Sequence, residues 1–423
     1  MTSKDIGGLN VLAGFDQRAK QMSGIVVVGG GQAGASLVAK LRLLEPAVPI
    51  MLICGESVPP YQRPPLSKAY LLGDMTEERL YLRPEAWYSD NSIDLRLGCP
   101  VTAIDADRKA VDVGGEWIAY DKLVLTTGSI PNHLPAAIGG DLEGVFTVRG
   151  LADVDRMEPR FQHGARALVV GGGYIGLEAA AVATKLGVHV TLIEMSPRIL
   201  GRVASAETAD VIRAEHLAHG ADIREGVGLE KLVGEGGHVT GALLTDGTML
   251  HVDFAILGMG IRPDTRLAES AGLLCDNGIA VDEFGRTSVD GIWAAGDCTS
   301  FPYKGGRLRL ESVQNAIDQA EVVAQNLLGA KIQYVPQPWF WSDQYDLKLQ
   351  IAGLNTGHDR VVLRDTGDTR SFWYFKGDQL LAVDAINAPR DYMVGKRLIE
   401  AGKSPQAEIL ADPDTDLKAL LKS

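Results

Sequence analysis

Short apolar runs that alternate with glycine-rich turns and helical stretches dominate the first two-thirds of the chain. Residues 24–28 form an apolar run, residues 29–34 are rich in glycine, and a helical stretch then continues to about residue 44. A second apolar run follows at residues 50–53, after two prolines. This succession predicts a buried strand, a tight turn, a helix and a second strand parallel to the first.

The same succession occurs once more, further along the chain. Residues 165–170 and 189–194 are predicted to form strands. Residues 171–176 form the glycine-rich turn between them, and the helix that follows it ends near residue 186. Two such units predict an α/β fold with two Rossmann-like dinucleotide-binding domains.

The remaining segments predict smaller sheets. Residues 241–245 and 249–252 flank Asp246-Gly247, a dipeptide typical of a β-hairpin, and a buried strand is expected at 254–257. Beyond Pro336 the pattern predicts strands followed by helices, which is typical of an α+β domain. The ranges expected there are strands at 347–354, 361–363, 372–375 and 380–386, and helices near 391–400 and 416–421.

Composition narrows the class of protein. The chain has 423 residues, of which 46% are hydrophobic and 22% charged, as in a globular protein of about three domains. No apolar run is long enough to span a bilayer, and residues 1–23 lack the apolar core of a secretory signal. We therefore expect a cytoplasmic protein without membrane contact. The net charge of −13 and the absence of lysine or arginine blocks argue against a nucleic-acid partner.

The first glycine-rich turn has the spacing of a dinucleotide-binding motif. Gly29 permits the tight turn, Gly31 lets a diphosphate approach the backbone, and Gly34 lets the helix pack closely on the strand. The helix N-terminus offers free N–H groups to the phosphates. Glu56, after the second strand, either accepts hydrogen bonds from an adenosine ribose or is a solvated loop carboxylate.

A Gly-Asp pair far along the chain indicates which dinucleotide binds at this turn. A predicted strand leads into Gly296 and Asp297. The glycine would let the backbone approach a ribityl-phosphate chain, and Asp297 would accept hydrogen bonds from ribityl hydroxyls. Asp297 could instead cap the following helix. The pair and the first glycine turn together predict bound FAD.

The second glycine-rich turn repeats the motif with Gly171, Gly173 and Gly176. Glu194 closes the next strand, at the position from which an acidic side chain accepts hydrogen bonds from ribose hydroxyls and repels a 2′-phosphate. We therefore predict NADH as the second dinucleotide. Arg198 lies nearby in the sequence and is the one feature that favours NADPH.

The cysteines exclude several kinds of site. The chain contains four, Cys54, Cys99, Cys275 and Cys298, and no two of them are close in sequence. No Cys-x-x-Cys pair, zinc-ligand spacing or disulfide framework is present, so we predict no metal site. Scattered cysteines of this kind are usually buried and reduced.

Several further segments are shared with a known family. They are Tyr-Gln-Arg-Pro-Pro-Leu-Ser-Lys-Ala-Tyr at 61–70, Glu-Ser-Val-Gln-Asn at 311–315 and Pro-Trp-Phe-Trp-Ser-Asp-Gln-Tyr at 338–345. The first glycine turn precedes these segments and the second lies between the first two of them. In this order of motifs the chain resembles the two-dinucleotide flavoprotein reductases shaped like glutathione reductase. Within that group it is most similar to the putidaredoxin reductase type, the NADH–ferredoxin reductases that serve oxygenases.

The resemblance implies a set of cofactor-binding residues. It implies FAD contacts for Ala33, Glu56, Arg63, Lys68, Val101, Thr127, Gly128, Arg149, Asp297 and Val313. It implies NADH contacts for Gly173, Ile175, Glu194 and Gly260, and places Trp341 in an aromatic segment near the flavin. One segment departs from the family: residues 129–132 read Ser-Ile-Pro-Asn where relatives often carry an arginine, so this chain lacks the arginine that would contact a diphosphate there.

Three residues are candidates for the chemistry itself. By the resemblance, Lys68 would point at flavin N5, where an ammonium stabilises the reduced anionic flavin, and Glu178 would form an ion pair with it. Lys68 could otherwise be a surface lysine after a Pro-Pro loop. Tyr174 either moves to admit the nicotinamide or only packs in the core.

The sequence also predicts where the electrons leave. Disulfide reductases of this fold carry a cysteine pair beside the flavin, but here Pro-Pro-Leu-Ser-Lys occupies residues 64–68. Without a dithiol the electrons must leave one at a time to an external acceptor. We therefore expect a small acidic [2Fe–2S] ferredoxin that serves a monooxygenase or a dioxygenase.

An acidic ferredoxin needs basic residues to dock against. Candidates are Arg307 and Arg309, with Lys304 beside them, and Lys418, with Lys396 and Arg397, in the C-terminal helices. The alternatives are a solvated surface at these positions and, for the whole chain, an NADH oxidase or rubredoxin-type reductase, or a non-catalytic NADH-sensing flavoprotein. We expect a monomer or weak homodimer.

The expected division of the chain follows from these motifs. Residues 1–21 are predicted to be a disordered extension. The FAD-binding domain is expected in two parts, 22–135 and 264–335, with the NADH-binding domain at 136–263 between them. Residues 336–423 are expected to form the C-terminal α+β domain.

Overall fold

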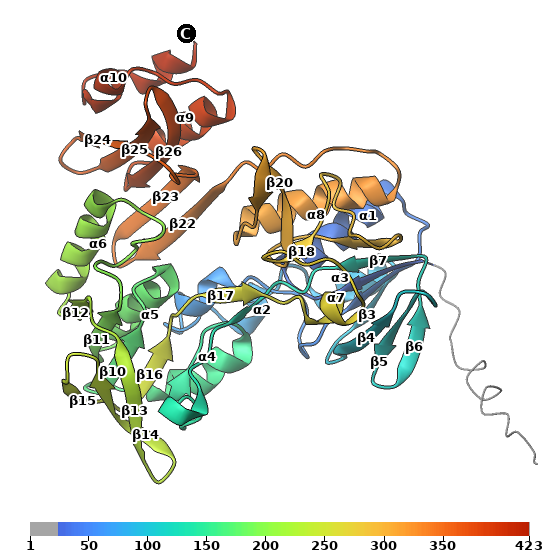
Figure 1. The fold of residues 1–423 in the computed structure, drawn as a ribbon, viewed down its shortest axis with the longest axis horizontal. Coiled ribbons are helices and arrows are strands. Elements are labelled where there is room, and N and C mark those ends of the chain that lie inside the picture. Colours follow the sequence, from blue (N-terminus) through green and yellow to red (C-terminus); the bar gives the residue numbers. More distant parts are fainter. Residues whose placement is uncertain (1–23, 423) are drawn as a thin grey trace, which may run out of the picture.

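The computed structural model describes residues 24–422, so the predicted extension at residues 1–21 lies outside the described part of the chain. Two regions are built on five-stranded parallel sheets and a third on a five-stranded antiparallel sheet. Figure 1 shows the two parallel-sheet regions side by side, with the third region standing over the second.

The first sheet has the strand order β19-β7-β1-β2-β3. Every residue of β1 and β2 is buried, as expected for a parallel sheet covered on both faces. One face packs on helices α1 (Gln32–Leu44) and α8 (Val313–Leu327), and the other on the small β4-β5-β6 sheet. The five strands are β1 (Ile25–Val28), β2 (Ile50–Ile53), β3 (Ile93–Arg96), β7 (Lys122–Leu125) and β19 (Ile292–Ala294).

The chain leaves the first sheet after β7 and returns to it with β19. Between these strands it builds the second sheet, in the order β12-β11-β10-β16-β9, with helix α5 (Tyr174–Lys185) after β10 and α6 (Ala206–Ala218) after β11. The strands are β9 (Val145–Phe146), β10 (Arg166–Val170), β11 (His189–Glu194), β12 (Asp222–Glu225) and β16 (Phe254–Leu257).

Two short antiparallel strands, β8 (Ser129–Pro131) and β17 (Ile261–Pro263), join the two parallel-sheet regions. The amide of Asn132 donates a hydrogen bond of 3.0 Å to the carbonyl oxygen of Met259 beside them. This link occupies part of the segment that departs from the family pattern. It brings the carboxyl ends of both parallel sheets toward one another, and ligands of such sheets bind at those ends.

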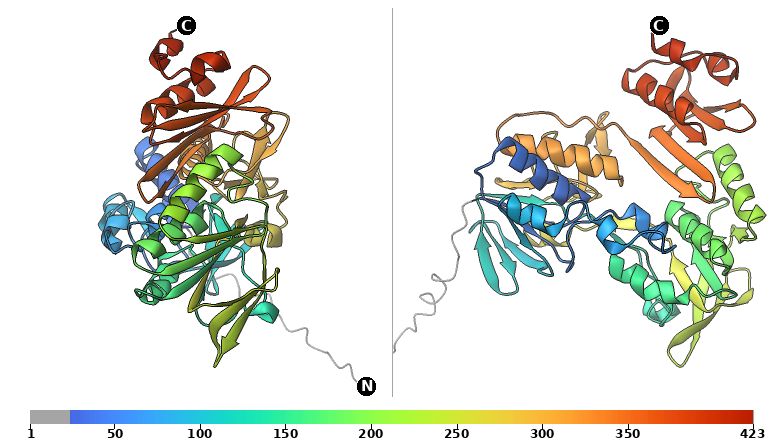
Figure 2. Two further views of the ribbon diagram at one scale, coloured as in Figure 1. Left: turned by 90° about the vertical axis from the view of Figure 1, so that its left-hand side faces the viewer. Right: turned by 180° about the vertical axis from the view of Figure 1, so that it is seen from behind.

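The third region is an antiparallel sheet in the order β22-β23-β26-β25-β24, packed on helix α9 (Pro389–Glu400). Figure 2 shows the β22–β23 hairpin extending out of this region toward α5 and α6. Trp373 and Tyr374 are fully buried in this sheet, one on each face. The strands are β22 (Trp339–Gln344), β23 (Leu347–Gly353), β24 (Arg360–Asp365), β25 (Arg370–Lys376) and β26 (Gln379–Ile386).

Most predicted elements are present within a few residues of the expected ends. Other elements were not predicted, and three of these belong to the hairpin or to the third region. They are β22, the short helix α10 (Ala407–Ala411), and β13 (Leu229–Glu235), which extends the predicted hairpin of β14 (His238–Leu244) and β15 (Met249–His251) to three strands. The aromatic residues of β22 are half-buried on both faces, and its two fully buried residues, Ser342 and Gln344, are polar. The segment therefore shows no alternation of apolar and polar residues.

The remaining elements are short and lie mostly between the sheets. No helix within residues 24–422 is both long and apolar enough to cross a membrane. These elements are η1 (Pro64–Ser67), α2 (Glu77–Leu80), α3 (Glu85–Asp90), β4 (Val101–Asp105), β5 (Ala110–Val113), β6 (Glu116–Ala119), α4 (Leu151–Met157), α7 (Arg266–Ser270), β18 (Ile279–Ala280), β20 (Thr299–Tyr303), β21 (Gly306–Leu308) and η4 (Leu417–Leu421).

Candidate functional site

A large cavity of about 1170 Å³ lies where the two parallel sheets and the β22–β23 hairpin meet. Its wall includes residues of both glycine turns, of η1 and of the aromatic strand β22. The predicted site residues that line it are Gly29, Gly31, Ala33, Glu56, Arg63, Lys68, Val101, Thr127, Gly128, Arg149, Gly173, Tyr174, Ile175, Glu178, Gly260, Asp297, Val313 and Trp341.

Gly34, Gly171, Gly176 and Glu194 are the predicted site residues that do not line the cavity. The three glycines shape the turns from behind. A Cβ atom on Gly34 would lie 2.1 Å from the carbonyl oxygen of Gly29, and one on Gly176 would lie 2.2 Å from that of Gly171. Gly171 itself has a φ of +106°, which disfavours a residue with a side chain.

Gly31 and Gly173 face the cavity, and the protein around them leaves room for a ligand. A Cβ atom on either residue would meet no protein atom within 4 Å. Both residues also have ordinary extended backbone angles, with φ of −86° and −81°. Neither backbone strain nor protein packing therefore requires glycine at these two positions. A diphosphate bound against each helix N-terminus would require it, because a side chain would occupy the space of the diphosphate.

Glu194 lies behind the second turn. Its carboxylate accepts hydrogen bonds from the backbone N–H groups of Gly172, at 2.8 Å, and Ser196, at 2.7 Å. Arg198, the one feature that favoured NADPH, is turned away into backbone: its guanidinium donates to the carbonyl oxygens of Ala204 and Ser205, at 2.7 and 3.2 Å. The guanidinium of Arg198 is thus already bound to backbone oxygens, so Arg198 no longer favours NADPH.

Replacing Glu194 with alanine is expected to reduce the preference for NADH over NADPH by roughly tenfold, because one charged acceptor and one source of repulsion are lost. The measurement is kcat/KM for each dinucleotide with ferricyanide as the acceptor. Glu225→Ala at the end of β12 serves as the control, since Glu225 bonds Arg213 and Ile199 outside the cavity wall. An unchanged NADH/NADPH ratio in Glu194→Ala would refute the assignment.

A group of charged side chains lines the wall near the first turn. Arg63 forms an ion pair of 2.6 Å with Glu56, whose other oxygen accepts a hydrogen bond of 2.6 Å from Tyr61. Arg149 forms no ion pair with any residue in 24–422, and burial together with the neighbouring Arg63 guanidinium lowers its pKa. An arginine in this condition fits an anionic ligand such as a diphosphate.

Asp297 closes the same wall from the end of β19. Burial raises the pKa of its carboxyl, and Arg149 opposes that shift. Its single hydrogen bond within the described residues is one of 3.3 Å from the Ser129 hydroxyl. A partly buried carboxylate with free acceptor capacity beside open space suits ligand hydroxyls, so the wall fits the ribityl part of FAD.

Lys68 and Glu178 meet at the centre of the cavity, as the resemblance implied. Lys68 follows η1 and Glu178 lies on α5, and their Nζ and Oε2 atoms are 2.7 Å apart. Hydroxyls of Ser67 and Ser342 donate to the two carboxylate oxygens at 2.8 and 2.6 Å. Lys68 is therefore not a surface lysine: its side chain is 18% exposed and paired with a buried partner.

Tyr174 and Trp341 lie on the side of the cavity nearest the third region. The Tyr174 ring packs edge-on against Phe340, with centroids 4.8 Å apart, and burial raises the pKa of its hydroxyl. That hydroxyl has no hydrogen-bond partner among the described residues. Tyr174 is thus packed in this structure, and its movement as a gate stays a prediction. Trp341 packs against Trp339, with centroids 5.7 Å apart.

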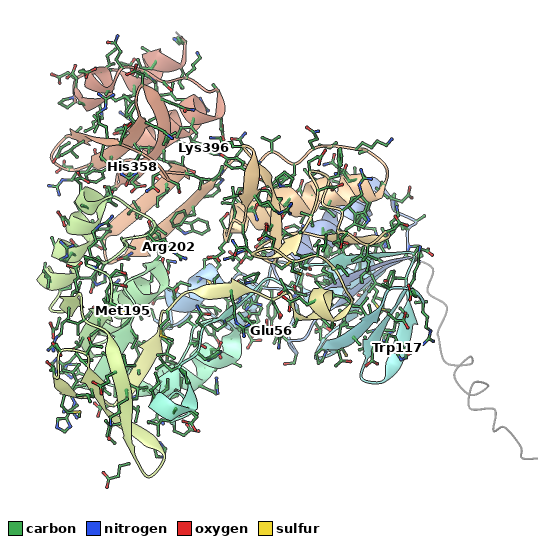
Figure 3. The ribbon with its side chains drawn as sticks, in the orientation of Figure 1. Glu56, Trp117, Met195, Arg202, His358 and Lys396 are labelled. Carbon is green, nitrogen blue, oxygen red and sulfur yellow. The ribbon has the colours of Figure 1, made fainter. Side chains whose placement is uncertain are left out.

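Arg202 and Asp384 are among the cavity residues that were not predicted as site residues from the sequence. Figure 3 shows Arg202 between the β22–β23 hairpin and α5, with Glu56 well apart from it in the centre of the molecule. Asp384 is fully buried on β26, and its Oδ2 accepts hydrogen bonds from Tyr374 and, at 2.9 Å, from Thr208. The signal for Asp384 was a single acidic residue within the apolar strand of residues 380–386.

Replacing Asp384 with asparagine is expected to flatten the pH dependence of stability. Burial raises the pKa of this carboxyl from 3.8 to about 7. Between these values the folded state holds the proton more tightly than the unfolded chain, so the free energy of unfolding falls as pH rises through the window. The wild type should lose on the order of 3–4 kcal/mol through this group, and the variant should not.

The measurement for Asp384→Asn is the urea midpoint of the wild type and the variant at several pH values from 4 to 8. Taking the difference between the two proteins removes the contribution of all other titrating groups. The amide oxygen of asparagine keeps the acceptor for Tyr374 and Thr208. If the urea midpoints of the two proteins change in parallel from pH 4 to 8, Asp384 does not titrate in this range.

None of the four cysteines lines the cavity. Burial raises the pKa of Cys54 to about 12 and that of Cys298 to about 11, which leaves both without appreciable thiolate. The stretch beside the cavity centre that carries a dithiol in disulfide reductases is here the short helix η1. The arrangement offers no sulfur relay for electrons.

Thiol labelling of the native protein should follow this pattern. At about pH 8, a thiol reagent is expected to modify Cys99 and Cys275, which are partly exposed, and to leave Cys54 and Cys298 unmodified until the protein unfolds. NADH-dependent reduction should be unchanged after labelling. Rapid modification of Cys54 or Cys298 with loss of activity would contradict the account.

The predicted docking cations differ in their surroundings. Arg307 donates hydrogen bonds to the Ser300 hydroxyl, at 3.1 Å, and to the Val281 carbonyl oxygen, at 3.0 Å. Arg309 pairs with Glu311. Lys418 lies in η4, a few residues before the C-terminus, and Figure 1 shows the C-terminus at the outer end of the third region, away from β20. The structure therefore does not gather these three residues into one patch.

Comparison with known proteins identifies the class to which this cavity belongs. Residues 23–320 match the pyridine nucleotide-disulphide oxidoreductase family, and residues 339–421 match the reductase C-terminal domain. The chain belongs to the pyridine nucleotide-disulphide oxidoreductase family. Members of this family use FAD and NAD(H), which agrees with the two glycine turns.

The relatives define the branch. The chain is 42% identical, over 93% of its length and 97% of the relative's, to the ferredoxin reductase subunit of 5,5′-dehydrodivanillate O-demethylase from Sphingobium sp. (strain NBRC 103272 / SYK-6). It is 39% identical to putidaredoxin reductase of Pseudomonas putida, over 94% and 96%. It is therefore a putidaredoxin reductase-like member of the family.

A solved structure shows the same architecture. The reductase in the crystal structure of the covalent putidaredoxin reductase–putidaredoxin complex superposes with a TM-score of 0.91 at 38% identity, covering 96% of this chain and 99% of the other. The likeness includes the antiparallel third region. The family name refers to disulfides, yet this chain lacks the dithiol.

Proposed function

We propose that this protein is an NADH-dependent ferredoxin reductase, which passes electrons from NADH through FAD to a [2Fe–2S] ferredoxin that serves a monooxygenase or a dioxygenase. The observation that carries the proposal is the Lys68–Glu178 ion pair at the cavity centre, in a cavity whose wall contains no cysteine. An acceptor outside the protein must then receive the electrons.

FAD is proposed to lie along the first glycine turn. Gly29 and Gly31 would hold its diphosphate, with Arg149 as the nearby cation, and Asp297 would accept from its ribityl hydroxyls. Glu56 and Arg63 would contact the adenosine side. The remaining proposed contacts are those of Ala33, Gly34, Lys68, Val101, Thr127, Gly128 and Val313.

NADH is proposed to lie along the second turn. Gly171, Gly173 and Gly176 would form its diphosphate site, and Glu194 would bind the adenosine ribose. Ile175 and Gly260 would line the route to the flavin, where Tyr174 would move aside. When both are bound, NADH would supply a hydride to the flavin, which would pass the two electrons singly to the external acceptor; the protein supplies position and charge.

Lys68 is proposed to place an ammonium next to the reacting end of the flavin. Glu178 holds that ammonium at 2.7 Å, and Ser67 donates a hydrogen bond of 2.8 Å to the same carboxylate oxygen. A fixed positive charge there stabilises negative charge that develops during reduction. Apolar and aromatic residues such as Leu66, Phe340 and Trp341 exclude water from the same part of the cavity.

The ferredoxin is proposed to dock where β22 and the segment before α8 border the cavity. Trp341 lies in this wall, and Arg309 immediately precedes wall residues 310–313. Arg307 is the adjacent cation on β21, and Lys396 lies 5.6 Å from the Trp339 ring on the other side. Lys418 would act only as a distant, steering charge.

The proposal is tested by measuring ferredoxin-dependent reduction of cytochrome c, with NADH and with NADPH. The acceptors are putidaredoxin, the ferredoxin encoded nearby, and rubredoxin, because relatives 36% identical to the chain are named rubredoxin–NAD(+) reductases. Faster turnover with a [2Fe–2S] ferredoxin supports the proposal, and faster turnover with rubredoxin identifies the second candidate. Slow turnover with every acceptor and a long-lived reduced complex would indicate an NADH sensor.

A further inference from the structure

Glu178 is held from two different parts of the molecule. Its Oε2 atom receives Lys68 and Ser67, both from the segment around η1. Its Oε1 atom accepts a hydrogen bond of 2.6 Å from Ser342, which lies on β22 in the third region. The third region therefore fixes one half of the carboxylate that holds Lys68.

The direction of each hydrogen bond beyond Ser342 follows from elementary donor counting. A carboxylate only accepts, so the single hydroxyl proton of Ser342 must point to Glu178. The contact of 3.0 Å between Ser342 Oγ and the Gln344 side chain must then be donated by the Gln344 amide nitrogen. The Gln344 oxygen consequently faces the next partner, His216, at 2.8 Å.

His216 is the third donor in the series, and its Nδ1 atom lies 3.4 Å from the Tyr345 hydroxyl. Its Nε2 atom must carry a proton, because it meets the Gln344 oxygen, and burial lowers the pKa of the ring, which keeps it neutral. His216 is fully buried on α6, and Ser342 and Gln344 are each 1% exposed. Three donors in series thus point toward Glu178, from α6 through β22 to α5.

We propose that Ser342, Gln344 and His216 are positioning residues, which fix the orientation of the Lys68–Glu178 pair by hydrogen bonds donated in one direction across three elements. Ser342 and Gln344 are two residues apart on β22, so their side chains lie on the same face. None of the three lines the cavity, so each acts only through Glu178. The inference rests on the proposed role of Lys68 in reduction by NADH.

The arrangement gives the third region a part in the chemistry. Without Ser342, Oε1 of Glu178 has no partner, and the carboxylate can rotate about its terminal torsion. Lys68 then loses its fixed position beside the flavin. Binding of NADH should not change, because the second glycine turn is untouched.

The test is stopped-flow reduction of the holoenzyme by NADH, which separates the limiting rate of reduction from the Kd of NADH. Ser342→Ala is expected to reduce at about one-tenth of the wild-type rate, with an unchanged Kd. Ser342→Thr keeps the hydroxyl and should recover most of the rate. Ser371→Ala is the matched control, since it removes a buried serine–carboxylate bond of 2.6 Å, to Asp391, in the same sheet but away from the cavity.

Gln344→Ala is a second variant that disturbs the same hydrogen bonds, and it tests the inference even if Ser342→Ala folds poorly. It leaves Ser342 in place but frees its hydroxyl to turn, so a rate about threefold below the wild type is expected. Wild-type rates in both Ser342→Ala and Gln344→Ala, or an equal loss in Ser371→Ala, would overturn the inference. Reduction by NADH can be measured with ferricyanide as the acceptor and without a ferredoxin. If the enzyme failed to reduce any ferredoxin, that result would contradict the proposed function but not the positioning role of Ser342.

Discussion

Lys68→Ala is expected to retain FAD but to be reduced by NADH on the order of 100-fold more slowly than the wild type, because the fixed positive charge at the cavity centre is lost. Glu178 would remain buried at the same place with its two serine donors. The loss should therefore appear in the limiting rate of reduction, and the Kd of NADH should change little.

Two further variants separate charge from folding. Lys40→Ala removes a lysine from another ion pair, 2.9 Å from Glu321, at a position outside the cavity wall, and should reduce at the wild-type rate. In Lys68→Met/Glu178→Gln no unpaired charge remains, so stability should recover while reduction stays slow. Reduction of Lys68→Ala at the normal rate would remove Lys68 from the mechanism.

Alanine at Gly31 or at Gly173 is expected to separate folding from cofactor binding. Neither methyl group would meet a protein atom within 4 Å, and both backbone conformations are open to alanine. Each methyl would instead occupy the space proposed for a diphosphate. Gly31→Ala should fold with an affinity for FAD lower by on the order of 100-fold, and Gly173→Ala should keep FAD but lose NADH affinity to a similar degree.

The neighbouring glycines provide the contrast. Alanine at Gly34 or Gly176 would place its methyl 2.1 or 2.2 Å from a backbone oxygen, so these variants should lose stability before they lose a cofactor. Thermal unfolding and the flavin spectrum distinguish the two kinds of change. A Gly31→Ala protein that purifies with a full complement of FAD would contradict the proposed path of the diphosphate.

The fold was largely predictable because its strongest signals are local. Each parallel strand is an apolar run followed by a glycine turn, and the two units at residues 24–53 and 165–194 appear as expected. Strand β22 was not predicted, since its aromatic residues are partly buried on both faces by contacts with α5 and the cavity. Such burial depends on distant parts of the chain, so the sequence of this strand shows no alternation of apolar and polar residues.

Those residues of the candidate site that belong to a sequence motif could be predicted, and the others could not. The glycines and the Lys68–Glu178 pair follow from patterns and resemblance. Ser342 and His216 do not, because their connection to Glu178 spans 164 residues in one case and passes through Gln344 in the other. Arg198 was misleading for the converse reason: proximity in sequence to Glu194 gave no sign that backbone carbonyls would occupy its guanidinium.

Electrons that enter from NADH should leave singly, to an iron–sulfur protein. Double-mixing stopped-flow tests this expectation directly: the enzyme is first reduced with one equivalent of NADH without oxygen, then mixed with a [2Fe–2S] ferredoxin. Two ferredoxins should be reduced per enzyme, and an added disulfide should not be reduced. Rapid reoxidation by a disulfide or by oxygen, with no ferredoxin reduced, would contradict this expectation.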